Sequence, residues 1–163
     1  MLVAVFMNLY GSTGLDGDPM FLGMAYGLAD TSAAIMSGFV LRYVKDYNAF
    51  RVSYLIAICG MVTFYYSTKD GKSSLISYIS YYFTELGCAF NYTSIFLMIE
   101  HRTPIEHLGS ALVVVFSIGM VASSASPYIV TQDQPIPFYT SISLFVAAIV
   151  CCSLLPAPKF QHI

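Results

Sequence analysis

Long apolar runs separated by short polar segments make up most of this chain. The clearest case is the polar octet of residues 100–107. It lies between residues 73–99, which carry only Glu85 as a charge, and residues 108–132, which carry none. Each run exceeds the roughly 20 residues that an α-helix needs to cross the hydrocarbon core of a bilayer. The pattern therefore predicts a transmembrane helical hairpin whose turn is the octet.

The rest of the pattern predicts five full membrane spans and one partial span. Asp16-Gly17-Asp18 forms a short acidic loop, and Pro19 suits the first turn of the helix that follows. Residues 1–14 are apolar but short, so we expect the outer part of a helix whose beginning is missing. Within a single transmembrane helical domain of residues 1–163, the predicted spans are 1–14 (partial), 19–41, 52–68, 74–99, 108–131 and 138–155.

Composition indicates the same class of protein. Hydrophobic residues make up 57% of the chain, charged residues make up 10%, and the mean hydropathy is +0.70. A soluble domain carries roughly 25% charged residues. The net charge is -2 and no basic patch could neutralise phosphates, so no nucleic-acid partner is expected. We therefore predict an all-α membrane protein whose main partner is the lipid bilayer.

The distribution of Lys and Arg predicts an orientation, because basic residues are retained on the cytoplasmic side of a membrane. Alternate loops carry five basic residues on one side and two, Lys69 and Lys72, on the other. The five are Arg42, Lys45, Arg51, Arg102 and Lys159. We expect a multi-pass protein of the plasma membrane whose C-terminus lies in the cytosol.

Several short motifs resemble the C-terminal half of the organic ion transporters of the major facilitator superfamily. They are Tyr10-Gly11, an acidic residue followed by small residues in 27–34, a basic loop at 42–46, Glu-His-Arg-Thr-Pro at 100–104, and Ser-Pro-Tyr at 126–128. The resemblance covers nearly the whole chain. The basic loop lacks the family's Gly-Arg-Arg, and Glu106 stands where the family has an arginine.

This resemblance implies both a fold and a function. The chain would form the C-terminal six-helix half of a major facilitator fold and would take part in transmembrane transport of small organic ions by alternating access. A complete member binds its substrate between two such halves, near the bilayer midplane. We therefore expect a half or fragment of a secondary transporter that works with a second copy or with a missing N-terminal half.

Asp30 is the strongest candidate for substrate binding. A charge at the centre of a membrane helix costs about 3 kcal/mol on insertion scales, so Asp30 should face protein or water. A substrate or proton role and a structural pairing with Ser, Tyr or a basic group both remain open, and a gapless alignment moves the family's acidic position to Thr31. The resemblance adds Tyr10, Asn91 and Tyr92, because the family's seventh and tenth helices line the cavity and aromatic faces attract organic cations.

Other polar and small residues receive gating or structural roles. Glu85 is expected to lie nearer a helix end and to reach the interface. The two Glu-His pairs of the octet are not expected to bind metal, since Pro104 interrupts the helix that would align them. Small residues in 119–126 are assigned to close helix packing. The residues assigned to gating at the cytoplasmic loops are Arg42, Lys45, Asp46, Glu100 and Arg102.

Enzyme chemistry has no support in the sequence. No paired carboxylates, Ser-His arrangement or phosphate-binding glycine loop stands out, so neither catalysis nor a cofactor is expected. A second function stays open, namely a non-transporting membrane assembly or regulatory subunit that retains the fold. The altered loop motifs favour this second function, whereas a midplane carboxylate with nearby aromatic residues favours transport.

Overall fold

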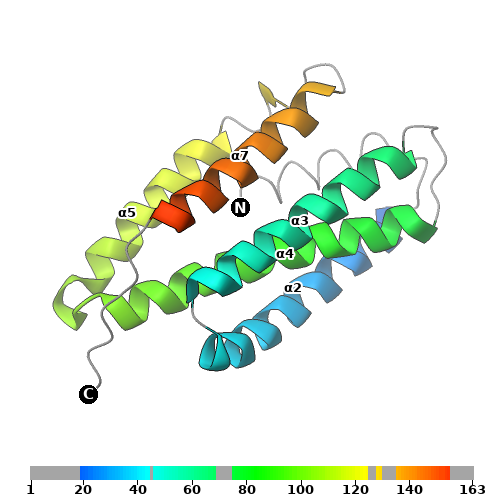
Figure 1. Ribbon diagram of the computed structural model, residues 1–163. Helices are drawn as coiled ribbons and strands as arrows, with labels where there is room; N and C mark the ends of the chain where they lie inside the picture. The colour runs from blue at the N-terminus through cyan, green and yellow to red at the C-terminus, as the bar shows by residue number, and fades with distance from the viewer. Residues whose placement is uncertain (1–18, 45, 69–74, 125–127, 130–134, 155–163) are drawn as a thin grey trace.

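Five α-helices account for almost all of the chain that the computed structural model describes, residues 19–44, 46–68, 75–124, 128–129 and 135–154. This part of the chain is all-α, as predicted, and contains no strand (Figure 1). The predicted partial helix 1–14 lies outside the described residues. The helices are α2 (Pro19–Tyr43), α3 (Asp46–Thr68), α4 (Leu75–Arg102), α5 (Ile105–Ser124) and α7 (Pro135–Leu154).

The helices coincide with the five full segments predicted from the sequence, but two boundaries differ by more than three residues. The segment predicted at residues 52–68 corresponds to α3, which already begins at Asp46. An acidic residue is favourable in a first helical turn, and no Gly or Pro interrupts residues 46–51. The segment predicted at residues 108–131 corresponds to α5, which ends at Ser124, shortly before Pro127.

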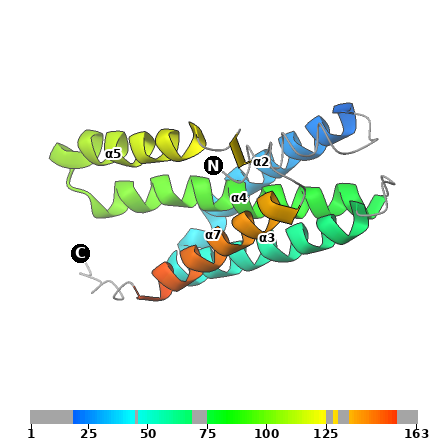
Figure 2. The same ribbon diagram turned by 90° about the horizontal axis from the view of Figure 1, so that it is seen from above.

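The polar octet forms the turn of a helical hairpin, as predicted. Helix α4 ends at Arg102 and α5 begins at Ile105. The Thr103 N–H donates to the Ile99 carbonyl oxygen at 2.9 Å, and the His107 N–H donates to the Pro104 carbonyl oxygen at 2.9 Å. Figures 1 and 2 show α5 running back alongside α4.

Helix α4 is the centre of the arrangement. It packs against α2 on one side and α3 on another, and it contacts α5 less extensively (Figure 2). Helix α7 packs on α3, where Phe138 stacks on Tyr65 with a centroid separation of 4.2 Å and Phe145 lies 5.9 Å from Tyr54. Helices α2 and α3 make few contacts with each other.

Small side chains line the contact between α3 and α4. They recur at alternating intervals of three and four residues, the spacing of a helix–helix seam. We call this contact the α3–α4 seam. Its members are Ser53, Ala57, Gly60, Phe64 and Ser67 on α3 and Ser77, Ser80, Thr84, Gly87, Asn91 and Ser94 on α4.

Two glycines bring the backbones of α3 and α4 into contact. A Cβ atom at Gly87 would lie 2.6 Å from the Ser53 carbonyl oxygen and 2.9 Å from the Ala57 nitrogen. A Cβ atom at Gly60 would lie 2.7 Å from Oγ1 and 2.8 Å from the backbone nitrogen of Thr84. Only glycine fits at these two positions without a shift of one helix.

Hydrogen bonds connect the helices near both ends of the α3–α4 seam. The Ser53 hydroxyl donates to Asn91 Oδ1 at 2.6 Å, and the Ser77 hydroxyl donates to Ser67 Oγ at 3.0 Å. Both bonds join residues that face each other only when the two helices run antiparallel in this register. They therefore fix the sliding position of α4 along α3.

Helix α2 packs on α4 through another set of small residues. Ala29 and Ala33 are fully buried and belong to one hydrophobic cluster with Leu86 and Phe90 of α4. A hydrogen bond of 2.9 Å joins Ser32 Oγ to the hydroxyl of Tyr82. This contact sets which face of α2 is turned toward α4.

The close packing predicted for small residues in 119–126 is not seen in the described part of that segment. A Cβ atom at Gly119 would meet no atom within 4 Å, and Ser124 is exposed. Residues 125–127 lie outside the described residues. The close approach occurs instead at the α3–α4 seam, at Gly60 and Gly87.

Exchanging Gly87 for alanine tests the backbone contact. We expect Gly87→Ala to destabilise the purified protein by about 1–3 kcal/mol, because the added methyl group forces α3 and α4 apart. Thermal unfolding in detergent measures this change. The matched control is Gly119→Ala, also within a helix, which should be neutral or slightly stabilising. Equal unfolding temperatures for the two variants would contradict the α3–α4 seam.

Candidate functional site

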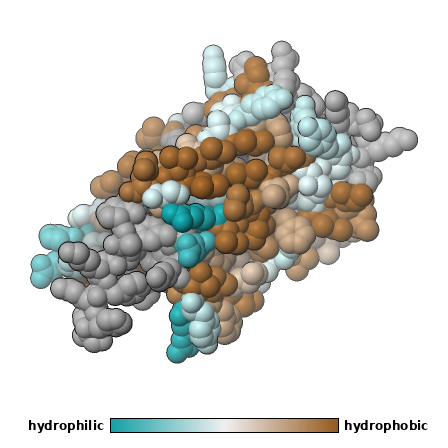
Figure 3. Space-filling model, in the orientation of Figure 1, coloured by the Kyte–Doolittle hydropathy of each residue, from teal (hydrophilic) through white to brown (hydrophobic). Residues whose placement is uncertain are grey.

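Polar side chains lie inside this bundle while large apolar side chains cover its outside. The buried polar residues of the described part are Ser37, Ser53, Ser77, Ser80, Thr84, Glu85, Asn91, Ser94 and Ser141. Exposed Phe, Leu, Ile, Val and Met residues occur on all five helices. In Figure 3, hydrophobic atoms cover most of the described surface in view, and strongly hydrophilic atoms form a few small areas.

Glu85 is the only acidic residue among the buried side chains of the described part. Only 1% of its surface is exposed, and its Oε1 atom has no hydrogen-bond partner. The neighbouring Thr84 hydroxyl is occupied, since it donates to the Ser80 carbonyl oxygen at 2.9 Å. A buried carboxylate oxygen without a partner is costly, so Glu85 does not hold the fold together through Oε1.

The expectation that Glu85 lies near a helix end and reaches the interface is wrong. Helix α4 starts at Leu75 and ends at Arg102, so Glu85 lies roughly 15 Å along the axis from its first residue. Its side chain is covered rather than extended toward either end. The burial depends on how α4 is packed by its neighbours, which the local sequence does not encode.

Asp30 lies on α2 beside this buried carboxylate. The Asp30 and Glu85 side chains are close enough to interact electrostatically, and Tyr26, one turn before Asp30, interacts with both. Asp30 itself is exposed and has no hydrogen bond or ion pair within the described residues. We call Asp30 and Glu85 the acidic pair.

Thr31, the alternative to Asp30, is also exposed, but its hydroxyl donates to the Gly27 carbonyl oxygen at 2.8 Å. Of the two neighbours, Asp30 therefore offers the free polar group. Asp30 was predicted as a site residue from the sequence, whereas its pairing with Glu85 was not, because the two residues are far apart in the chain. No local sequence pattern links them, since Asp30 lies on α2 and Glu85 lies on α4.

The predicted residues Asn91 and Tyr92 point in different directions. Asn91 is buried in the α3–α4 seam, where its Oδ1 accepts a hydrogen bond from Ser53 and its Nδ2 has no partner. Tyr92 lies seven residues after Glu85, on the same face of α4, and its ring centroid is 4.8 Å from that of Phe96. Tyr10 lies outside the described residues.

The described gating candidates lie at one end of the bundle. Arg42 is exposed in the last turn of α2, and Glu100 is exposed near the end of α4. Because α3 and α4 are antiparallel, the α2–α3 and α4–α5 turns share this end (Figure 1). Residue 45 and the side chains of Asp46 and Arg102 lie outside the description.

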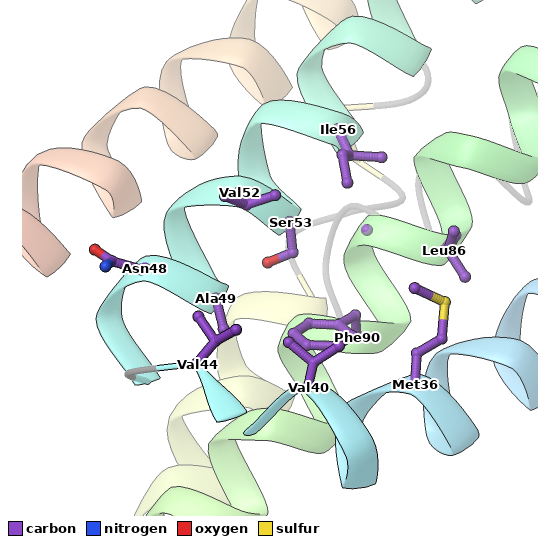
Figure 4. A pocket seen from close by; sticks show the side chains of 11 residues that line it. Met36, Val40, Val44, Asn48, Ala49, Val52, Ser53, Ile56, Leu86 and Phe90 are labelled. Atoms are coloured by element: carbon purple, nitrogen blue, oxygen red, sulfur yellow. The ribbon is translucent and has the colours of Figure 1, made fainter. Parts of the chain in front are cut away.

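An apolar groove separates α2 from α3, with α4 as its floor (Figure 4). Its volume is about 160 Å³. The groove could not be predicted from the sequence, because the groove depends on the distance between two helices that hardly touch. We call it the α2–α3 groove. It is lined by Met36, Val40 and Val44, by Asn48, Ala49, Val52, Ser53 and Ile56 of α3, and by Leu86, Gly87 and Phe90 of α4.

Comparisons with models of protein families, with curated proteins and with solved structures found no match. By length and composition, two described helical stretches could cross a membrane, Gly23–Tyr43 and Asn48–Ser67. Shorter apolar stretches occur in α5 and α7. Within the described residues, no group of three or more His, Cys, Asp or Glu side chains could hold a metal ion.

Replacing Glu85 by methionine tests whether the carboxyl group has a structural role. Methionine has a similar shape and no polar oxygen, so Glu85→Met should stabilise the protein by about 1–3 kcal/mol. Thermal unfolding in detergent measures the change, and Glu100→Met, at an exposed position, should stay within about 0.5 kcal/mol of the original protein. A loss of stability in Glu85→Met would show that this carboxyl group supports the fold.

Proposed function

We propose that this chain is a multi-pass membrane protein that takes part in moving small organic cations, as one half of a secondary transporter. The observation that carries the proposal is the acidic pair, an exposed Asp30 beside a buried Glu85 whose Oε1 has no partner. Carboxylates within a membrane bundle are expensive and characteristically mark substrate or ion pathways. A cation is the ligand that suits two neighbouring carboxyl groups.

The distribution of polarity supports the membrane location. Large apolar residues on the outside suit contact with lipid, and hydroxyl and amide groups are turned inward. Close contact through Gly, Ala and Ser is the usual way in which helices associate in a bilayer, where apolar burial alone gives little driving force. Helix α4 carries the most polar stripe, and that stripe is covered by α3 at the seam.

The acidic pair and the aromatic residues near it suit an organic cation. Asp30 offers a carboxylate at the surface of the described bundle, and Glu85 holds a second one in its interior. The electrostatic attraction of both for a cation is stronger there than in water. Tyr26 interacts electrostatically with both carboxyl groups, and aromatic faces attract organic cations.

Asn91 has a different role in this proposal. Its amide oxygen is used by Ser53, and its side chain lies in the α3–α4 seam. Asn91 therefore positions α4 relative to α3 and does not contact the substrate. A separate N-terminal half or a second copy would cover the exposed side of Asp30 and complete the pathway.

Uptake measurements on the complete assembly test the role of the acidic pair. Asp30→Asn and Glu85→Gln each remove one carboxyl group at nearly constant size, so each should lower the uptake of an organic cation by at least about tenfold, or ~1.4 kcal/mol. Uptake of a neutral solute should change little. Glu100→Gln is the matched control at an exposed position. Unchanged cation uptake in both variants of the acidic pair, with normal membrane insertion, would refute the proposal.

A non-transporting assembly subunit is the second candidate, and one observation favours it. A Cβ atom at Gly23, Gly27 or Gly38 would meet nothing within 4 Å, so α2 carries small residues on an open face. Such residues suit the docking of another helix. If cation uptake survives both changes of the acidic pair while Gly27→Leu prevents co-purification with a partner, the assembly role replaces transport.

Accessibility of inserted tags tests the membrane orientation. Five described helices separate Gly17 from Ile163, so tags at these two positions should lie on opposite sides of the membrane. The excess of basic residues predicts the tag after Ile163 in the cytosol and the tag at Gly17 outside. Labelling of intact and permeabilised cells measures this. Both tags on one side would contradict five crossings.

A further inference from the structure

The buried hydroxyl groups that precede Glu85 on α4 are satisfied in a way that its carboxyl group cannot copy. Ser80 and Thr84 each donate to a backbone carbonyl oxygen four residues earlier. A carboxylate only accepts hydrogen bonds, and the N–H groups in the middle of a helix already donate within that helix. Glu85 is 1% exposed, and its Oε1 has no partner. The side chain is therefore buried without the donors that a carboxylate needs.

The titratable groups that interact with Glu85 within the described residues supply no positive charge. They are Asp30 and Tyr26 of α2 and Tyr81 and Cys88 of α4. No titratable group in the described parts of α3, α5 or α7 interacts with it. All four neighbours are acids, so each is neutral or negative. Burial and repulsion from Asp30 therefore both oppose a negative charge on Glu85.

The two carboxyl groups of the acidic pair have different environments. A buried carboxylate without a partner is far more costly than the neutral carboxylic acid, so Glu85 favours its protonated form when no cation is bound. Asp30 is exposed on α2, at the side where the pathway was proposed above. Different environments of this kind assign different roles to two neighbouring carboxyl groups. Asp30 carries the negative charge, and Glu85 carries a proton.

We propose that Glu85 is a proton-binding site and that an organic cation entering the acidic pair displaces its proton, so that the protein exchanges cations for protons. The O–H bond of Glu85 breaks, the proton leaves past Asp30 to water, and the cation compensates both carboxylates. The net charge of the site is unchanged, because one positive charge replaces another. The proposal rests on the cation transport proposed above and adds its coupling ion.

Competition between the two occupants predicts a dependence on pH. A cation beside Glu85 stabilises the carboxylate, and a proton on Glu85 removes part of the attraction for the cation. Such a coupling between two binding equilibria is reciprocal. The affinity for a cation therefore rises with pH while Glu85 is protonated, by up to about tenfold per pH unit, and becomes constant once the proton is lost.

Infrared spectroscopy of the purified protein in detergent tests the proton itself. At neutral pH the spectrum should contain the carbonyl band of a buried protonated carboxyl group. Glu85→Gln should remove this band, and Glu100→Gln, at an exposed position, should retain it. Absence of the band in the original protein would overturn the proposal and leave cation transport standing.

Proton release on cation binding tests the exchange. Tetramethylammonium is the probe, because it is permanently charged and has no proton of its own to release. In weakly buffered solution the complete assembly should release about one proton per bound cation. Glu85→Gln should release none, and its affinity for tetramethylammonium should change little with pH. Binding to the original protein without proton release would overturn the proposal.

Absence of tetramethylammonium binding at every pH would refute the transport function, and proton exchange with it, even where the infrared band is present. This outcome is distinct from a missing band, which refutes the proton site alone.

If Glu85→Gln does not fold, Asp30→Asn gives a second measurement at an exposed position. This variant should bind tetramethylammonium more weakly and still show the infrared band, because the proton belongs to Glu85. Loss of the band in Asp30→Asn would overturn the assignment. In vesicles with the membrane potential clamped, an acidic interior should raise tetramethylammonium uptake by the original assembly several-fold. Uptake that is independent of the proton gradient would also overturn the exchange.

Discussion

The backbone contact between α3 and α4 is the constraint on which the rest of the structure depends. Gly60 and Gly87 leave no room for a side chain, so the two helices approach until backbone meets backbone. At that distance Ser53 reaches Asn91 and Ser67 accepts from Ser77, which fixes the register. The contact also covers the polar stripe of α4, and this leaves the outer faces of the bundle largely apolar.

The acidic pair and the groove both follow from this contact. Once α3 covers the stripe that contains Asn91, Glu85 is turned away from the seam toward the side where α2 carries Tyr26 and Asp30. Helix α2 is anchored on α4 by Ala29, Ala33 and a hydrogen bond between the Ser32 and Tyr82 hydroxyls, and it hardly touches α3. The space between α2 and α3 is the groove.

The helices and the hairpin turn could be predicted from the sequence, because apolar runs and the polar octet are local signals. Helix α3 begins earlier than predicted, since Asp46 and Arg51 were interpreted as loop residues although they continue the helix. Asp30 was predicted from its charge within an apolar run and from the family resemblance of residues 27–34. The burial of Glu85 could not be predicted, because it depends on which face of α4 each neighbouring helix covers. The spacing of Gly87 and the serines of α4 is a local pattern, but it does not show which of the other helices packs against it.

Helix α2 borders both the acidic pair and the α2–α3 groove. Its Asp30 face carries the acidic pair, and its Met36 and Val40 face forms one wall of the groove. Because α2 rests mainly on α4 and barely on α3, its position is set by small residues and one hydrogen bond between side chains. The distance between Asp30 and Glu85 follows from this contact, since it is determined by how α2 lies on α4.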